Sequence, residues 1–211
     1  MYSNVEYTNI NKPLIAMYGG SFNPIHTGHI QLAKYFLDEL KLDKLLLIPD
    51  NKPPHKSDSE MVSPLHRYNM CKLAVEDTDK IEVSDIEIRR EGKSYTVDTL
   101  KQLSNIYPTA QLFLIMGADM YLSLHTWRNF QKILEYAIIC AVPRDTDSID
   151  ELIKYSASLE ENGAKYIISN KSMMNVSSTS IRENIKKGNP IAGMVGSKVE
   201  NYIFKNSLYS G

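Results

Sequence analysis

The chain has 211 residues, which at roughly 150 residues per domain predicts one domain with at most an elaboration. Hydrophobic residues make up 43% and charged residues 23%, an ordinary globular composition that excludes a disordered or collagen-like chain. Lysine and arginine number 24 against 25 acidic residues, so the net charge of −1 gives no reason to expect nucleic acid or an anionic membrane as a partner.

In chain order, short apolar runs alternate with longer amphipathic segments, the pattern of a parallel sheet with helices on both faces. Strands are predicted at 14–18, 45–48, 112–116, 137–142 and 166–168, with one or two extended segments over 81–88. Helices are predicted at 29–40, 64–76, 97–106, 127–134, 149–159, 178–187 and 197–205. We therefore expect one α/β domain over residues 13–211, with a small helical part at its C-terminal end and a loose extension over residues 1–12.

The cellular setting is also predicted from what the sequence lacks. No apolar run approaches the ~20 residues needed to cross a bilayer. Residues 1–12 do not combine a basic start with an apolar stretch, so we expect no secretory signal and a cytoplasmic protein. Cys71 and Cys140 both lie among apolar residues and are predicted to be buried, reduced thiols, although a disulfide between them is the alternative.

A glycine pair, Gly19-Gly20, ends the first predicted strand and leads through a turn into a helix that begins with two histidines, His26 and His29, on either side of Gly28. Glycine lets the backbone approach a ligand, and a helix start offers unpaired N–H groups to an anion. This arrangement favours a phosphate site. Two alternatives stay open, namely a metal site built on the histidines and a purely structural turn, although no further metal-ligand pattern such as His-Glu-x-x-His accompanies them.

A second candidate phosphate site lies near the C-terminal end, in Val176-Ser-Ser-Thr-Ser-Ile-Arg182. Its hydroxyl groups precede a predicted helix and can donate to an anion, and Arg182 adds a permanent guanidinium. The alternative is that Ser180 and Glu183 form a capping box and the hydroxyl groups only start the helix.

The two motifs together resemble those of the nucleotidyltransferase superfamily, in the order in which that superfamily carries them. The resemblance implies a Rossmann-like α/β fold, and it implies that His26, His29 and Arg182 act in catalysis on ATP. The residues expected to bind ATP are Gly19, Gly20, Ser21, Phe22, His26, Gly28, His29, Gly117, Asp119, Ser178, Thr179 and Arg182. Two positions depart from the usual motif: Asn23 stands where the family often has aspartate, and Ser21 where threonine is frequent.

Further segments narrow the resemblance to the bacterial nicotinate-nucleotide adenylyltransferases. They are Pro53–Lys56, Ser94–Leu100, Gly117–Asp119 with His125–Trp127, and Val199–Ile203 with Leu208-Tyr209. The resemblance implies transfer of the adenylyl group of ATP to nicotinate mononucleotide, giving nicotinate adenine dinucleotide and pyrophosphate. It also implies Mg²⁺, held mainly by the ATP phosphates.

The residues assigned to the acceptor are Asn51, His55, Lys56, Tyr95, Thr96 and Trp127. An indole face suits stacking on a cationic pyridinium ring, and N–H groups at a helix start could hold the carboxylate. The alternatives are a tryptophan that belongs to the core and residues that only cap a helix. In the family Asp119 contacts ribose, but here it could instead cap a helix over 120–124; Arg144 could border the adenosine.

Rival functions remain at this stage. They are a sister adenylyltransferase acting on nicotinamide mononucleotide or phosphopantetheine, a non-catalytic ATP-sensing module, and a metal-dependent hydrolase that uses His26 and His29. The sequence does not distinguish a monomer from a homodimer.

Overall fold

The computed structural model describes residues 1–5, 12–53, 61–145, 149–172 and 176–210. It contains one seven-stranded sheet in the spatial order β1-β7-β6-β5-β2-β3-β4. Every neighbouring pair is parallel except β1 with β7. The strands are β1 (Tyr2–Ser3), β2 (Leu14–Gly20), β3 (Lys44–Pro49), β4 (Ile81–Val83), β5 (Gln111–Gly117), β6 (Ala137–Val142) and β7 (Tyr166–Ile168). The predicted fold class is therefore confirmed.

The order of the strands locates the place where a ligand would bind. The chain runs outward from β2 to β3 and β4, then returns so that β5 pairs with the other side of β2. In an open parallel sheet, ligands bind outside the carboxyl ends of the strands at such a reversal. The residues at that edge are Gly19 and Gly20 of β2 and Gly117 of β5.

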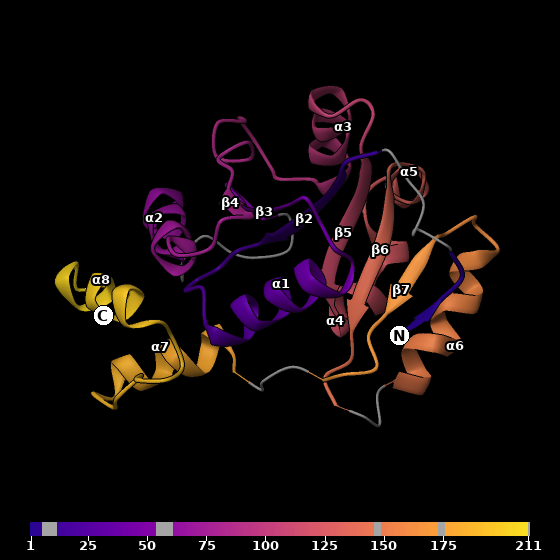
Figure 1. Ribbon diagram of the computed structural model, residues 1–211. Coiled ribbons are helices and arrows are strands. Elements are labelled where there is room, and N and C mark those ends of the chain that lie inside the picture. The colour runs from indigo at the N-terminus through magenta and orange to yellow at the C-terminus, as the bar shows by residue number, and fades with distance from the viewer. Residues whose placement is uncertain (6–11, 54–60, 146–148, 173–175, 211) are drawn as a thin grey trace.

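Helices cover both faces, and the alternation of side chains along each strand explains why (Figure 1). Ala16 and Tyr18 point into one apolar cluster, and Ile15 and Met17 into the other. The first cluster packs against α1 (Thr27–Glu39), α2 (Pro64–Val75), α7 (Ser178–Lys186) and α8 (Ser197–Lys205). The second packs against α3 (Thr96–Ile106), α4 (Ala118–Leu122), α5 (Phe130–Tyr136) and α6 (Ile149–Glu160).

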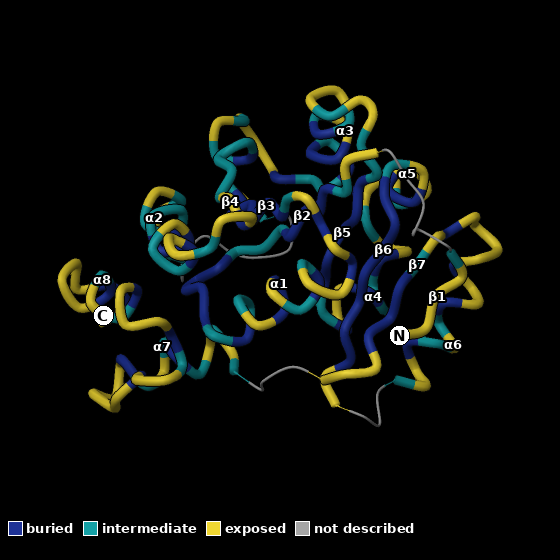
Figure 2. The backbone as a smooth tube through the Cα atoms, viewed as in Figure 1, coloured by how far each residue is buried: buried dark blue, intermediate teal, exposed yellow. Residues whose placement is uncertain are grey.

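The central strands are buried along most of their length, as Figure 2 shows for β5 and β6. Cys71 and Cys140 are buried, free thiols, as predicted. Helices α7 and α8 form the expected C-terminal helical part and lie beside α2 and the start of α1 (Figure 1). Among the helices within the described ranges, none is long and apolar enough to cross a membrane.

Three expectations about local structure are wrong. Residues 1–12 are not wholly a loose extension, because Tyr2–Ser3 pairs with β7 and the Asn4 amide bonds to the backbone of Ala164 and Tyr166. Only 81–83 of the predicted extended region is a strand. Residues 86–88 form a turn, in which the buried carboxylate of Glu87 accepts from the hydroxyl of Thr99.

The helix predicted over 127–134 begins instead at Phe130. Asn129 takes a left-handed conformation, with φ 52°, which separates α5 from the short 3₁₀ turn η2 (Leu124–Thr126). Trp127 therefore lies in the extended link between these two elements. Its side chain packs against the second apolar cluster without being fully buried.

Candidate functional site

The first motif forms the turn that leads from β2 into α1. A side chain at Gly20 would place its Cβ only 3.1 Å from the ring of Phe22, so this strand end tolerates nothing larger than glycine without moving that ring. Phe22 adopts a positive φ of 46° and is 2% exposed. Its ring lies edge-on to that of His29, with the ring centroids 5.0 Å apart, so Phe22 packs directly against the imidazole.

His26 and His29 cap α1 reciprocally. The N–H of His29 donates to Nδ1 of His26 at 3.3 Å, and the N–H of His26 donates to Nδ1 of His29 at 3.2 Å. The rings stack with centroids 3.5 Å apart. Because each Nδ1 accepts a hydrogen bond, a neutral ring at either position carries its proton on Nε2. Both histidines therefore present the same kind of donor at the start of the same helix.

Burial sets the charge of His26. The side chain of His26 is buried, and this desolvation lowers its pKa from the ordinary 6.5 to about 4. At neutral pH the imidazole of His26 is uncharged. Toward an anion it acts as a hydrogen-bond donor rather than as a cation.

The second motif packs onto the first. Arg182 on α7 donates from Nη1 to the carbonyl oxygen of Asn23 at 2.9 Å, and the hydroxyl of Ser178 donates to that of Pro24 at 2.8 Å. Thr179 lies beside the guanidinium, with Oγ1 3.4 Å from Nη2 of Arg182. Two segments more than 150 positions apart thus meet at the turn that carries His26.

The cap of α7 differs from the capping box considered as the alternative. The N-cap is Ser177, whose Oγ accepts from the N–H of Ser180 at 3.0 Å, so the alternative of a capping box from Ser180 to Glu183 is wrong. Capping by Ser177 leaves Ser178 to brace the first motif.

Asn23 connects this turn to two more segments. Its Oδ1 accepts from the buried hydroxyl of Tyr209 at 2.9 Å and from the N–H of Val62 at 3.3 Å. An aspartate here, the residue frequent in the family, could accept the same two bonds. The amide therefore keeps the bonding pattern without the charge.

On the acceptor side, Tyr95 is the N-cap residue of α3 but makes no side-chain capping bond. The guanidinium of Arg128 instead lies over its ring, with Cζ 4.5 Å from the ring centroid. Nη1 of Arg128 is also 3.9 Å from a carboxylate oxygen of Asp98. The start of α3, which contains Thr96, is thus joined to the residue that follows Trp127, so the structure brings these predicted acceptor residues into one neighbourhood.

Asn51 joins the same neighbourhood from the end of β3. Its N–H donates to Oγ of Ser94 at 3.0 Å, and its side-chain amide donates to the carbonyl of Arg90 at 3.1 Å. Ser94 directly precedes Tyr95. The predicted residues His55 and Lys56 lie outside the described residues.

Gly117 and Asp119 lie where β5 ends and α4 begins. Gly117 is the N-cap residue and Asp119 lies within the first turn of α4, so the alternative in which Asp119 caps a helix over 120–124 is wrong. The Asp119 carboxylate forms an ion pair with Arg144, which follows β6, and both side chains are more than half exposed. A carboxylate beside an exposed guanidinium is open to solvent and to a polar ligand.

The pair of Asp50 and Arg67 was not predicted from the sequence. Both side chains contact Ser21 in the first motif. One Asp50 oxygen accepts from the hydroxyl of Ser21 at 2.7 Å, and the other accepts from Nη1 of Arg67 at 2.9 Å. Arg67 is fully buried on α2. Arg67 lies in an ordinary helical pattern after Ser63-Pro64, and nothing in that pattern indicates that the residue is buried beside a functional site. The only indication in the sequence is Asp50, an acidic residue directly after β3.

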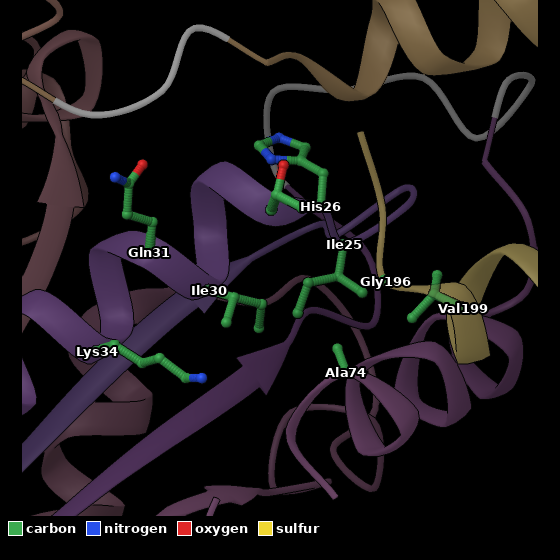
Figure 3. Close-up of a pocket in the computed structure, with 9 residues that line it drawn as sticks. Ile25, His26, Ile30, Gln31, Lys34, Ala74, Gly196 and Val199 are labelled. Carbon is green, nitrogen blue, oxygen red and sulfur yellow. The ribbon is translucent and has the colours of Figure 1, made fainter. Parts of the chain in front are cut away.

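The shape of the surface alone does not identify this site. A pocket of about 400 Å³ runs along α1 from His26 past Ile30 to Lys34, with Ala74 and Val199 opposite (Figure 3). Of the predicted site residues only His26 borders it. Within the described ranges, no three histidine, cysteine or acidic side chains lie together as a metal-binding group.

Most of the chain is similar in sequence to a known family of proteins. Residues 17–184 match the family model described as cytidylyltransferase-like. A protein of Clostridium tetani named "Probable nicotinate-nucleotide adenylyltransferase" is 40% identical over 92% of this chain and 98% of its own length. A Desulfitobacterium hafniense protein of the same name is 39% identical over 95% and 99%.

A solved structure of the Plasmodium falciparum nicotinic acid mononucleotide adenylyltransferase, complexed with NaAD, shares the fold with a TM-score of 0.78 at 22% identity. The structural match covers 93% of this chain and 97% of the Plasmodium chain. On the sequence matches, the chain belongs to the nicotinate-nucleotide adenylyltransferase family, within the cytidylyltransferase-like proteins.

Proposed function

We propose that the protein transfers the adenylyl group of ATP to nicotinate mononucleotide, releasing pyrophosphate and forming nicotinate adenine dinucleotide. The observation that carries this proposal is the contact of Arg182 and Ser178 with the Asn23-Pro24 turn that leads to His26. One triphosphate lying across the start of α1 would meet donors from both motifs. The names of the relatives support the choice of acceptor.

The reaction is an in-line displacement at the α-phosphorus of ATP. A phosphate oxygen of the mononucleotide forms the new P–O bond, the bond from the α-phosphorus to the bridging oxygen breaks, and that oxygen leaves with pyrophosphate. A phosphate monoester has a second pKa near ~6, so it is mostly deprotonated at neutral pH and needs no protein base. Catalysis then consists of alignment and stabilisation of charge.

The donor-side roles follow from the contacts described above. The Nε2–H groups of His26 and His29 donate to oxygens of the α- and β-phosphates, and Arg182 stabilises the charge that grows on the departing pyrophosphate. Gly19, Gly20 and Gly28 keep the backbone accessible to the phosphates. The remaining residues of the ATP side contact ATP or hold the residues that do; they are Ser21, Phe22, Ser178 and Thr179.

Mg²⁺ would be held mainly by ATP oxygens and water, because no cluster of three or more acidic, histidine or cysteine side chains occurs in the part of the chain that the structure describes. When bound, it offsets the negative charge of the triphosphate.

On the acceptor side, the indole of Trp127 would stack on the pyridinium ring, and the N–H groups of Tyr95 and Thr96 would hold its carboxylate. Asn51 borders the same space through its bond to Ser94. On the ATP side, Asp119 would contact a ribose, next to Gly117 at the end of β5. His55 and Lys56 are proposed to reach the acceptor from the loop that follows Asn51.

The test is pyrophosphate release from purified protein mixed with Mg²⁺, ATP and either nicotinate mononucleotide, nicotinamide mononucleotide or phosphopantetheine. We expect rapid release with the first and much slower release with the other two. Release that is fastest with another acceptor would assign the chain to a sister activity. ATP binding with no release from any mixture would contradict catalysis.

A further inference from the structure

Arg67 is a buried charge that no step of the proposed reaction uses. Its guanidinium carries five N–H groups, and the structure gives five acceptors. Nε donates to the carbonyl of Val62 at 3.2 Å. Nη1 donates to the carbonyl of Ser21 at 2.8 Å and to Oδ1 of Asp50 at 2.9 Å, and Nη2 donates to the carbonyls of Asp50 at 2.7 Å and Asn51 at 3.2 Å.

These acceptors belong to both sides of the site. Ser21 lies in the turn proposed to hold ATP, and Asp50 holds that turn twice more, through its N–H to Gly20 and its carboxylate to the Ser21 hydroxyl. Asn51 leads to the acceptor side, because its N–H bonds to Ser94, the residue before Tyr95. A continuous chain of hydrogen bonds therefore runs from the ATP turn through Arg67 to the start of α3.

Stability alone is a weak reason for such an arrangement. A buried ion pair can often be replaced by apolar residues of similar volume without loss of stability. An apolar residue could not replace the planar guanidinium group, whose N–H groups fix the positions of carbonyls from four different residues at once. Arg67 is fully buried and so cannot touch either substrate itself.

We infer that Arg67, with Asp50, is a positioning residue that couples the ATP side of the site to the acceptor side, so that binding of either nucleotide favours binding of the other. The inference rests on the proposed function, since it assumes that the two sides hold ATP and a mononucleotide. It assigns a role to a residue that neither motif includes.

The test compares Arg67→Lys with the wild type. Lysine keeps the positive charge opposite Asp50, but its three donors on one atom cannot reach the carbonyls of Ser21, Asn51 and Val62 together. Titration calorimetry measures the affinity of nicotinate mononucleotide with and without a non-hydrolysable ATP analogue. In the wild type we expect the analogue to raise that affinity by about 5-fold or more, the lower end of typical coupling between sites.

In Arg67→Lys this factor should fall close to 1, while the affinity for each nucleotide alone changes little. The kcat should fall by roughly 10–100-fold, the scale of loss for reactants displaced by about 1 Å. The exposed Arg89 on the neighbouring segment, which pairs with Asp85, provides the matched control. Arg89→Lys should leave the coupling and kcat as in the wild type.

A purely structural role for Arg67 would lower the melting temperature and leave the coupling factor and the kcat of the folded enzyme unchanged, and that result would overturn the inference. Absence of coupling in the wild type would overturn it too. If Arg67→Lys does not fold, Ser94→Ala serves instead, because it removes the acceptor for the Asn51 N–H, together with the bond of the Ser94 hydroxyl to the buried carboxylate of Glu87. We expect it to lower the coupling factor by about 3-fold, near 0.7 kcal/mol, within the range for one hydrogen bond; unchanged coupling in that variant would contradict the inference.

The two proposals can fail separately. A wild type that releases no pyrophosphate from any acceptor refutes the proposed function. An active wild type whose coupling survives Arg67→Lys refutes only the role of Arg67.

Discussion

The ATP side and the acceptor side of the candidate site are built differently. On the ATP side, Arg182 and Ser178 bond to main-chain carbonyls and the two imidazoles accept main-chain N–H groups. On the acceptor side, the side chains of Arg128 and Asp98 are 55% and 44% exposed and form an ion pair with one another. Exposed ion pairs contribute only about 0–1 kcal/mol, so they can yield to a ligand at little cost.

This contrast indicates a division of labour. Groups fixed by main-chain bonds are already in position before the substrate arrives, which is what stabilisation of a transition state requires. Exposed side chains that rearrange easily are suited to binding. Substitutions on the ATP side should therefore lower kcat, and substitutions on the acceptor side should mainly raise KM for the mononucleotide.

The largest effect is expected at His29. His29→Asn can keep an acceptor near the position of Nδ1, which caps α1, but it lacks a donor at the position of Nε2. We expect kcat to fall by about 10²–10³-fold, typical for loss of one donor to the transition state. Thermal unfolding should change little. Turnover close to that of the wild type would show that His29 serves only as a cap.

The next effect concerns pH. Burial lowers the pKa of His26 to about 4 in the folded protein, against 6.5 when exposed, so between these values the unfolded chain binds more protons. The free energy of unfolding should therefore fall as the pH falls from about 6.5 towards 4. The contribution of His26 is about 3 kcal/mol at most, at 1.36 kcal/mol per pKa unit.

Urea unfolding at pH 7 and pH 4.5 measures this loss. The control is His26→Asn, which can still cap the helix and does not titrate in this range. The variant should lose less stability than the wild type on acidification. An equal loss in both proteins would show that other groups cause it.

Arg182→Ala should come third. Removing a guanidinium that bonds to phosphate costs about 1.5–3 kcal/mol, so kcat/KM for ATP should fall by roughly 10–150-fold. The nicotinate mononucleotide KM should change much less. Steady-state kinetics with each substrate varied in turn would measure both effects. Equal effects on the two substrates would contradict the assignment of Arg182 to the ATP side.

The smallest effect is expected at Trp127, on the acceptor side. Loss of a stack between an indole and a cationic ring costs about 0.5–2 kcal/mol, so Trp127→Ala should raise KM for the mononucleotide by roughly 2–30-fold. Its kcat and its KM for ATP should stay near the wild-type values. A matching loss of affinity for ATP would instead show that the indole mainly supports the core, against which it packs.

The same contrast explains what the sequence could and could not predict. The predicted helix at 197–205 has the observed bounds, because its apolar positions Val199 and Ile203 recur at a helical spacing. The two phosphate motifs were recognisable because each consists of neighbouring residues. The resemblance also implied that the two motifs would meet. It did not imply the contacts between them, in which Arg182 and Ser178 bond to the carbonyls of Asn23 and Pro24.

Features held together by long-range contacts could not be predicted. Tyr209 and Asn23 are 186 positions apart, and their bond is visible only in the folded chain. Arg67 has no local signal, because the carbonyls that bury it come from three separate segments. The start of α5 was missed for a different reason: the left-handed residue Asn129 interrupts an otherwise helical pattern.

The central claim is that two distant segments hold one triphosphate. It is tested most directly by a crystal structure of the protein with Mg²⁺ and an ATP analogue that cannot be cleaved at the α-phosphorus. We predict that an imidazole Nε2 of the His26–His29 pair and the guanidinium of Arg182 lie within hydrogen-bond distance of phosphate oxygens of the same analogue. An analogue whose phosphates contact only one of these segments, or neither, would contradict the account.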